Sequence, residues 1–341
     1  MSKKGLGKIA LGATVGAGLA LLFAPKKGSD LRRDIKKKID DIIKDVDQMK
    51  VEDIKKEFKD KVEEVTNGIE DLNKEKVLKA AKKKGIKVYH LNIGQPDIET
   101  PPEILDAVRN ANITTLEYSH SAGNESYRRK LVEYYKGVGI SITPEQIIIT
   151  TGGSEAIQFG FFACLNPGDE VIIPEPFYAN YNGFACAAGV AVVPITSRIE
   201  TGFALPPIAD FEKVITSKSK AIVICSPNNP TGYLYSREEM EALKQLCIKH
   251  NLYLFSDEAY REFCYDGEYV SAMHLEGLEQ HVVLMDTISK RYSACGARLG
   301  ALVTKNKAVY DTAMKFAQAR LSPPGLAQIM GEAAVDLPAS Y

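Results

Sequence analysis

The chain has 341 residues, of which 45% are hydrophobic and 26% charged, with 43 Lys and Arg against 44 Asp and Glu. This is the composition of a folded protein with one large or two ordinary domains, and it excludes wholesale disorder, a collagen-like repeat and a multi-pass membrane protein. The six cysteines are scattered without a C-x-x-C pair, which indicates reduced thiols rather than a disulfide or zinc framework. We therefore expect no structural metal.

The charges are divided unevenly along the chain. Residues 1–87 carry 23 basic and 15 acidic side chains, a net charge of +8, whereas residues 88–341 carry 20 basic and 29 acidic side chains, a net charge of −9. This asymmetry predicts that two differently built pieces are joined.

An apolar run over residues 9–25 lies between two groups of lysines. About 17 residues is at the lower limit of what crosses a bilayer, and Gly12, Gly16 and Gly18 have the spacing that lets two membrane helices approach closely. A cleaved signal peptide and a buried hairpin stay open as alternatives, but no convincing small-x-small cleavage site precedes Lys26. We predict that residues 1–27 form an apolar, Gly-rich segment that is retained and associated with a membrane.

Residues 28–85 are dense in Lys, Asp and Glu, with apolar residues at three- and four-residue steps from Ile35 to Leu72. This period predicts a charged amphipathic helical region, solvated on one face, and no group in it indicates chemistry. The run from Gly16 to Arg32, with its Ala-Pro-Lys-x-Gly turn, is followed by this charged helix. In both features the first 85 or so residues resemble the YtxH-like family of small bacterial membrane-associated proteins.

After Gly85 the sequence changes to short apolar runs that alternate with helical stretches. The runs predict seven strands, at residues 146–151, 170–173, 190–195, 221–225, 252–256, 282–285 and 299–304. Most are continuously apolar, which is typical of strands buried on both faces, and helical stretches such as 154–165 and 236–250 lie between them. For residues 86–341 we predict an α/β fold with a mostly parallel seven-stranded sheet and ligands at the carboxyl ends of the strands.

Two turn motifs follow predicted strands. The segment 150–154, Thr-Thr-Gly-Gly-Ser, opens a helix whose N–H groups could face a phosphate, although a tight turn with Ser154 as the N-cap explains the motif alone. The segment 226–232, Ser-Pro-Asn-Asn-Pro-Thr-Gly, fixes an amide side chain that could donate to a ring oxygen, and alone it too is first a turn.

Two further strand ends carry ionisable groups. Asp257 ends one predicted strand, with Tyr260 three residues later, and a carboxylate there can keep a ring nitrogen protonated; a helix N-cap with a packed tyrosine is an equal alternative. Lys290 and Arg298 flank a loop between two strands. A lysine amine can form a Schiff base and an arginine suits a phosphate, although most lysines are merely solvated.

These motifs occur in an informative order. Gly-Gly-Ser, Asn-Pro-Thr-Gly, Asp-x-x-Tyr and Ser-Lys with Gly-x-Arg-x-Gly each follow a predicted strand, and Leu-Asn-Ile-Gly-Gln-Pro-Asp precedes them at residues 91–97. In this order the chain, from about residue 87 to 341, resembles the fold-type I pyridoxal-phosphate aminotransferases of the aspartate aminotransferase superfamily, class I/II.

The resemblance implies pyridoxal 5′-phosphate as cofactor and gives roles to individual residues. Lys290 matches the lysine that forms the internal aldimine and moves the substrate proton, and Asp257 matches the acid that pairs with the pyridinium nitrogen. Tyr260 and Asn229 match hydrogen-bonding partners of the ring 3′ oxygen, and Tyr178 matches the aromatic residue that stacks on the ring. The matches to the phosphate ligands are Gly153, Ser154, Thr287, Ser289 and Arg298.

Two more matches concern the neighbouring subunit and the substrate. Tyr118 matches a tyrosine that reaches the phosphate of the other subunit, which implies a homodimer with shared sites. Gly94 matches a loop glycine over the substrate, and Asn229 also contacts the substrate. The implied substrates are an amino acid and a 2-oxo acid.

The sequence departs from the family at both ends. The family continues past the region of residues 322–324 into a small domain that contributes the arginine for the substrate carboxylate, and no residue up to Tyr341 can be assigned that role. We therefore expect an aminotransferase part that is incomplete at its C-terminus, with its activity in doubt. Because the usual N-terminal arm is replaced by the YtxH-like segment, a fusion or an assembly artefact is our hypothesis for the chain.

The predicted function is amino transfer through Lys290, with aspartate as the first guess for the amino donor. A pyridoxal-phosphate-dependent lyase or decarboxylase on the same fold is the alternative among enzymes. A membrane-associated interaction protein with an inactive enzyme part is the alternative of another class. We expect a cytoplasmic protein with membrane contact through residues 9–25, and no nucleic-acid binding, because the basic excess lies in a mixed-charge helix with few aromatic residues.

Overall fold

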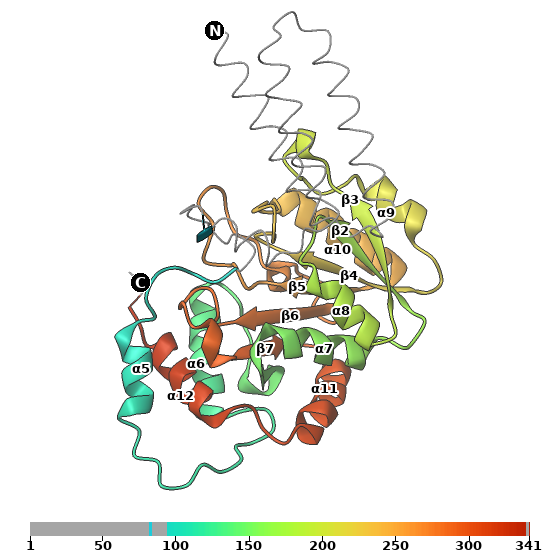
Figure 1. Cartoon of the computed structure of the whole chain (residues 1–341). Coiled ribbons are helices and arrows are strands. Elements are labelled where there is room, and N and C mark those ends of the chain that lie inside the picture. The colour runs from blue at the N-terminus through green and yellow to red at the C-terminus, as the bar shows by residue number, and fades with distance from the viewer. Residues whose placement is uncertain (1–81, 84–93, 339–340) are drawn as a thin grey trace, which may run out of the picture. The chain divides into compact units, whose positions relative to one another are not determined.

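A seven-stranded sheet runs through the part of the chain that the computed structural model describes, which is residues 82–83, 94–338 and 341 (Figure 1). The predicted segment 1–27 and nearly all of 28–85 lie outside the described residues. The strands are β1 (Ile147–Thr150), β2 (Glu170–Glu175), β3 (Ala191–Thr196), β4 (Ser219–Cys225), β5 (Tyr253–Asp257), β6 (Val282–Thr287) and β7 (Gly300–Val303). The helices are α5 (Pro102–Arg109), α6 (Glu125–Gly137), α7 (Gly152–Cys164), α8 (Asn180–Ala187), α9 (Ile208–Val214), α10 (Arg237–His250), α11 (Lys307–Ala319) and α12 (Gly325–Val335).

The strand order is β1-β7-β6-β5-β4-β2-β3, and only β7 runs antiparallel to its neighbours. All seven predicted strands are confirmed, as is the mostly parallel sheet. The carboxyl ends of β1, β4, β5 and β6 therefore meet at one edge of the sheet. The amino end of β7 joins them there, because Gly300 pairs with Thr150 on one side and Thr287 on the other.

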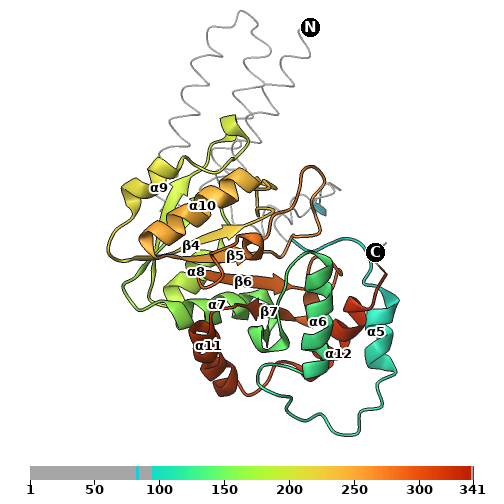
Figure 2. The same ribbon diagram turned by 180° about the vertical axis from the view of Figure 1, so that it is seen from behind.

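Alternate residues of each strand enter two separate cores. In β1, Ile147 and Ile149 pack on the face covered by α6, α10 and α12, and Ile148 packs on the face covered by α7, α8 and α11. Figures 1 and 2 show these two helix layers from opposite sides. Burial on both faces explains why the central strands are continuously apolar.

The prediction that the apolar runs form strands buried on both faces is wrong for the edge strand β3. Of its six residues only Ile195 is buried, because no strand lies beyond β3 and no helix covers it as fully as it does the centre. Pro194, which has no N–H to donate, is tolerated in this position at the edge of a sheet.

Across residues 82–83, 94–338 and 341, no helix combines the length and the apolar character needed to cross a bilayer.

Candidate functional site

The predicted site residues come together where the parallel strands end. Asp257 is the last residue of β5, Lys290 lies three residues after β6, and Gly153 lies in the first turn of α7, directly after β1. Asn229 lies in the turn that follows β4. Four loops from different parts of the chain thus bring an amine, a carboxyl group, an amide and a helix N-terminus to one edge of the sheet.

Asp257 is the buried acid of this site, with 9% of its surface exposed. Its Oδ2 accepts a hydrogen bond of 2.8 Å from Tyr181 Oη, and its Oδ1 accepts one of 3.2 Å from the Ala259 N–H. Burial raises the pKa of Asp257 to about 6, although the hydrogen bond from Tyr181 acts in the opposite direction. A carboxyl group in this state is a suitable partner for a protonated ring nitrogen, whose positive charge would stabilise the ionised form.

Lys290 lies beside two of the other predicted residues, Gly94 and Tyr260. Its Nζ donates a hydrogen bond to the Gly94 carbonyl and lies 5.8 Å from the centre of the Tyr260 ring. A Cβ at Gly94 would lie 3.6 Å from Lys290 Nζ and 3.7 Å from Tyr260 Oη, at ordinary contact distance, so Gly94 lies directly against both groups. Asn229 Nδ2 donates to Tyr260 Oη over 3.4 Å. Burial raises the pKa of Tyr260 to about 12, which keeps its phenol protonated and able to donate.

The first turn of α7 lies against Arg298. Gly152 has a φ of +71°, and a Cβ at this position would collide with the Arg298 guanidinium. The helix begins at Gly152, with Thr151 as the N-cap, so Ser154 lies inside the first turn and the alternative that Ser154 is the N-cap is wrong. The Arg298 guanidinium therefore lies next to the N-terminal turn of α7, whose N–H groups are of the kind that bind anions.

Two hydroxyl groups, one on the last residue of β6 and one two residues later, lie on the other side of this turn. Thr287 Oγ1 and Ser289 Oγ lie 2.7 Å apart, and Thr287 Oγ1 also bonds the Leu299 carbonyl over 2.9 Å. Thr287 faces Gly153, because a Cβ built on Gly153 would lie 3.8 Å from Thr287 Cβ. Arg298 is exposed in the left-handed conformation, with a φ of 52°, and its Nη1 donates to the Cys295 carbonyl.

Two predicted residues lie at the margin of this group. Tyr178 packs edge-on against Tyr181, with ring centres 5.5 Å apart, and so lies next to the partner of Asp257. Tyr118 lies between α5 and α6 and is 75% exposed, and no described contact joins it to the other site residues. Its role in a neighbouring subunit stays a prediction.

Sequence reasoning missed Tyr181, the hydroxyl donor to Asp257. The available signal was its spacing, since Tyr181 follows Tyr178 by three residues and both fall near the start of α8. Only the fold shows that the start of α8 lies against the end of β5.

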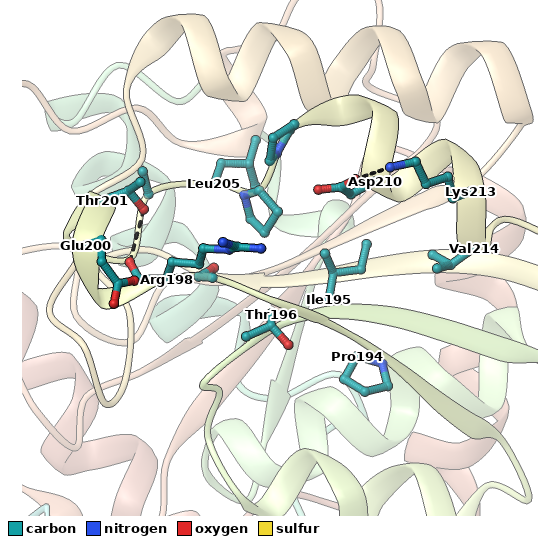
Figure 3. Close-up of a pocket in the computed structure, with 14 residues that line it drawn as sticks. Pro194, Ile195, Thr196, Arg198, Glu200, Thr201, Leu205, Asp210, Lys213 and Val214 are labelled. Carbon is teal, nitrogen blue, oxygen red and sulfur yellow. Dashed lines mark hydrogen bonds and ion pairs between the residues drawn. The ribbon is translucent and has the colours of Figure 1, made fainter.

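A hollow of about 960 Å³ lies beside the edge strand β3, between this strand and α9. Figure 3 shows its apolar walls, which include Ile195 and Leu205, together with Arg198 and the ion pair of Lys213 with Asp210. None of the predicted site residues lines it. The hollow is therefore separate from the site at the strand ends.

The sequence profile of the family described as aminotransferase class I and II matches residues 86–340. This match covers well over half of the chain, so the chain belongs to the class I and II aminotransferase family. A second profile, that of YtxH-like proteins, matches residues 6–70, so both predicted resemblances are confirmed.

Individual aminotransferases are similar over most of this domain. The aspartate/prephenate aminotransferase of Thermus thermophilus is 34% identical over 249 residues, which are 72% of this chain and 64% of that protein. The aspartate aminotransferase of Bacillus subtilis is 37% identical over 223 residues, 64% of this chain and 56% of that protein. The crystal structure of an aspartate aminotransferase from Thermotoga maritima superposes with a TM-score of 0.72 at 32% identity, covering 77% of this chain and 70% of that one. The chain thus spans less than two thirds of the length of these curated relatives.

Pyridoxal phosphate is the cofactor that this family normally uses. It offers an aldehyde, a ring nitrogen, a ring hydroxyl and a phosphate. The described site holds a group suited to each: the Lys290 amine, the Asp257 carboxyl, the Tyr260 and Asn229 donors, and the anion donors around Arg298. The residues present therefore fit this cofactor.

Proposed function

We propose that this chain is a pyridoxal-phosphate-dependent aminotransferase that moves an amino group between an amino acid and a 2-oxo acid. The observation that supports this most is the convergence of the Lys290 amine with the buried, hydrogen-bonded Asp257 at the ends of β6 and β5. Family membership and the names of the relatives agree with this proposal.

Each residue has a distinct task in the proposed reaction. When bound, pyridoxal phosphate supplies a carbonyl carbon for the amine and a ring that withdraws electrons from the substrate α-carbon. Lys290 Nζ takes and returns the proton of that carbon, and the Gly94 carbonyl orients the amine. The Asp257 carboxylate holds the proton on the ring nitrogen, and Tyr181 holds the carboxylate in place. Tyr260 and Asn229 donate to the ring oxygen.

The phosphate is proposed to lie among the donors between α7 and the loop before β7. Gly153 and Ser154 would offer backbone N–H groups, Thr287 and Ser289 their hydroxyls, and Arg298 its charge. Tyr178 would cover the ring.

Aspartate is the amino donor that we propose first, with 2-oxoglutarate as acceptor. The relatives at 34–37% identity include aspartate/prephenate, aspartate and alanine aminotransferases. Alanine and aromatic amino acids are the next donors to test.

The test begins with the full chain, to which pyridoxal phosphate is added and from which the excess is removed. We expect a visible absorbance band that borohydride abolishes, with the reduced label on the peptide that contains Lys290. Lys290→Ala should retain no label, whereas Lys307→Ala, on the exposed face of α11, should label like the wild type. A label on other lysines, or no retained cofactor, would contradict the proposal.

Product analysis separates amino transfer from its alternatives on the same fold. With aspartate and 2-oxoglutarate we expect glutamate and oxaloacetate in equal amounts. Free ammonia with pyruvate from a β-substituted amino acid would identify a lyase, and carbon dioxide released from aspartate together with alanine, without glutamate, would identify a decarboxylase.

The exposed Tyr118 supports a homodimer in which each subunit completes the phosphate site of the other. Mixing Lys290→Ala chains with Tyr118→Ala chains tests this, because one site of each mixed dimer would hold both intact residues. Recovered activity after mixing is the expected result, and two inactive populations that stay inactive would contradict shared sites.

The YtxH-like match over residues 6–70 favours a second role, attachment of a cytoplasmic enzyme to a membrane through residues 9–25. Fractionation of cells that express the full chain would place it with membranes, and Leu19→Asp with Leu21→Asp would release it. If the Lys290→Ala chain still performs the cellular role of the protein, the N-terminal segment rather than the enzyme is its working part.

A further inference from the structure

Four charged side chains are buried beside the site and form what we call the ion cluster: Glu258, Arg261, Asp286 and Arg291. Their side chains are 0%, 2%, 3% and 7% exposed, respectively. Two carboxylates face two guanidinium groups, so the ion cluster is neutral as a whole. None of the four was singled out by the sequence motifs.

Asp286 is the centre of the ion cluster. Its Oδ1 accepts hydrogen bonds from the Thr287 N–H, at 2.7 Å, and from Arg291 Nη2. Its Oδ2 accepts from Tyr135 Oη at 2.7 Å and from Arg261 Nη1 at 3.2 Å. Burial raises the pKa of Asp286, but the two arginines outweigh it and hold the pKa at about 2, so the carboxylate stays ionised.

Arg261 joins Asp286 to Glu258. Its Nε and Nη2 donate to Glu258 Oε2 at 3.2 and 2.9 Å, while its Nη1 donates to Asp286. Glu258 is held from its other side by the hydroxyls of Ser256, at 3.0 Å, and Ser271, at 2.8 Å. The guanidinium of Arg261 therefore connects the end of β5 to the end of β6.

The position of the ion cluster in the chain gives it a direct relation to the site. Glu258 follows Asp257, and Arg291 follows Lys290. An unbroken set of ion pairs thus runs from the residue after the site acid to the residue after the site lysine.

Stability alone is a weak reason for such a cluster, because apolar side chains of similar volume usually stabilise a protein as well as buried ion pairs do. Ion pairs add a directional constraint on the side chains that they join. A guanidinium fork bonds a carboxylate in one plane and at fixed angles, whereas apolar contacts tolerate sliding.

We propose that Arg291 and Asp286 are positioning residues, which, through Arg261 and Glu258, hold Lys290 at a fixed place relative to Asp257. The expected effect on amino transfer rests on the function proposed above. The expected effect on the geometry of the segments that carry Lys290 and Asp257 does not depend on that function.

The first test compares Arg291→Met, which keeps an unbranched side chain but removes the guanidinium and its charge, with Arg291→Lys, which restores a charge. Leu246→Ala is the matched control, because it opens the core at α10 without touching the ion cluster. We expect Arg291→Met to slow the borohydride-trappable linkage of pyridoxal phosphate to Lys290 by about tenfold or more and to change the visible circular dichroism of the bound cofactor. Arg291→Lys should recover part of both, and Leu246→Ala should change neither.

The second test needs no cofactor. Hydrogen exchange of the cofactor-free chain should become faster in the peptides that contain Asp257 and Lys290 in Arg291→Met, but not in Leu246→Ala. If Arg291→Met does not fold, Tyr135→Phe removes one hydrogen bond from Asp286 and should give a smaller effect of the same kind.

The outcomes separate the two proposals. Unchanged linkage rate, dichroism and exchange in folded Arg291→Met or Tyr135→Phe would overturn the positioning role. A wild-type chain that never links the cofactor would overturn the proposed function, while the exchange measurement would still decide the positioning role.

Discussion

The strand-end site and the hollow between β3 and α9 differ in almost every property except that both are accessible. The hollow is large, about 960 Å³, but half of its lining residues are apolar, and its Lys213 already pairs with Asp210. At the strand ends, chemically different groups from four loops point to one place, and several are buried with fixed partners. Convergence of side chains, rather than volume, therefore identifies the site in this chain.

Among the substitutions that test this comparison between the strand-end site and the hollow, Lys290→Ala should have the largest effect. We expect amino transfer to fall by at least about a thousandfold, because the group that moves the substrate proton is lost. The measurement is glutamate formation from aspartate and 2-oxoglutarate, with Lys307→Ala as the exposed-lysine control. A fall of less than tenfold would mean that another group does this work.

Asp257→Asn tests whether burial of the ionised Asp257 carboxylate lowers the stability of the fold, as the raised pKa of this group indicates. Because the folded state holds the proton up to a pH of about 6, against 3.8 when unfolded, the free energy of unfolding of the cofactor-free chain should fall as the pH rises from about 4 to 6. The expected loss is about 3 kcal/mol. Asp286 contributes in the opposite direction only below about pH 4, because its pKa is lowered to about 2.

Urea unfolding of the cofactor-free chain at pH 4, 5, 6 and 7 measures this difference. The wild type should lose stability across the interval, and Asp257→Asn should lose less by the amount assigned to this carboxyl. Parallel curves for the two proteins would show that Asp257 titrates normally.

Arg298→Ala should weaken cofactor binding while leaving the fold intact, since Arg298 is exposed. Loss of a charge-assisted hydrogen bond costs about 1.5–3 kcal/mol, which corresponds to a dissociation constant raised by about ten- to a hundredfold. Fluorescence titration with pyridoxal phosphate measures it. Arg237→Ala, which pairs with Glu268 on the surface, is the control and should bind normally.

Arg198→Ala, in the hollow, should have the smallest effect. Surface substitutions of this kind usually change stability by no more than about 0.5 kcal/mol, and we expect activity within twofold of the wild type. A large loss of activity would show that the hollow takes part in function after all and would end the contrast between the two regions.

Much of the fold could be predicted because its signals are local. Six of the seven strands are buried over most or all of their length, and their apolar sequences follow directly from this burial. The edge strand β3 was predicted in the right place but with the wrong environment. Its exposure depends on its position in the sheet order, which no local pattern contains.

The meeting of the candidate site residues could be predicted where these residues lie at or just after the ends of strands. Lys290, Asp257 and Asn229 carry their signal in the chain next to them. Tyr181 and Arg261 do not, because each acts on a residue in a different element: Tyr181 lies 76 positions before Asp257, and Arg261 lies 25 positions before Asp286. Such pairs become visible only when the sheet brings their elements together.

The antiparallel strand β7 has a consequence for how the chain folds. Thr287 and Gly300 are paired in the sheet, so Lys290 and Arg298 lie on one connection between neighbouring antiparallel strands, residues 288–299, which can close early through local contacts. Asp257 and Asn229 reach the same place only through parallel crossovers, which require distant segments to meet first. We therefore expect one half of the site to be organised by a nascent hairpin and the other half to appear with the final, slower docking of the parallel strands.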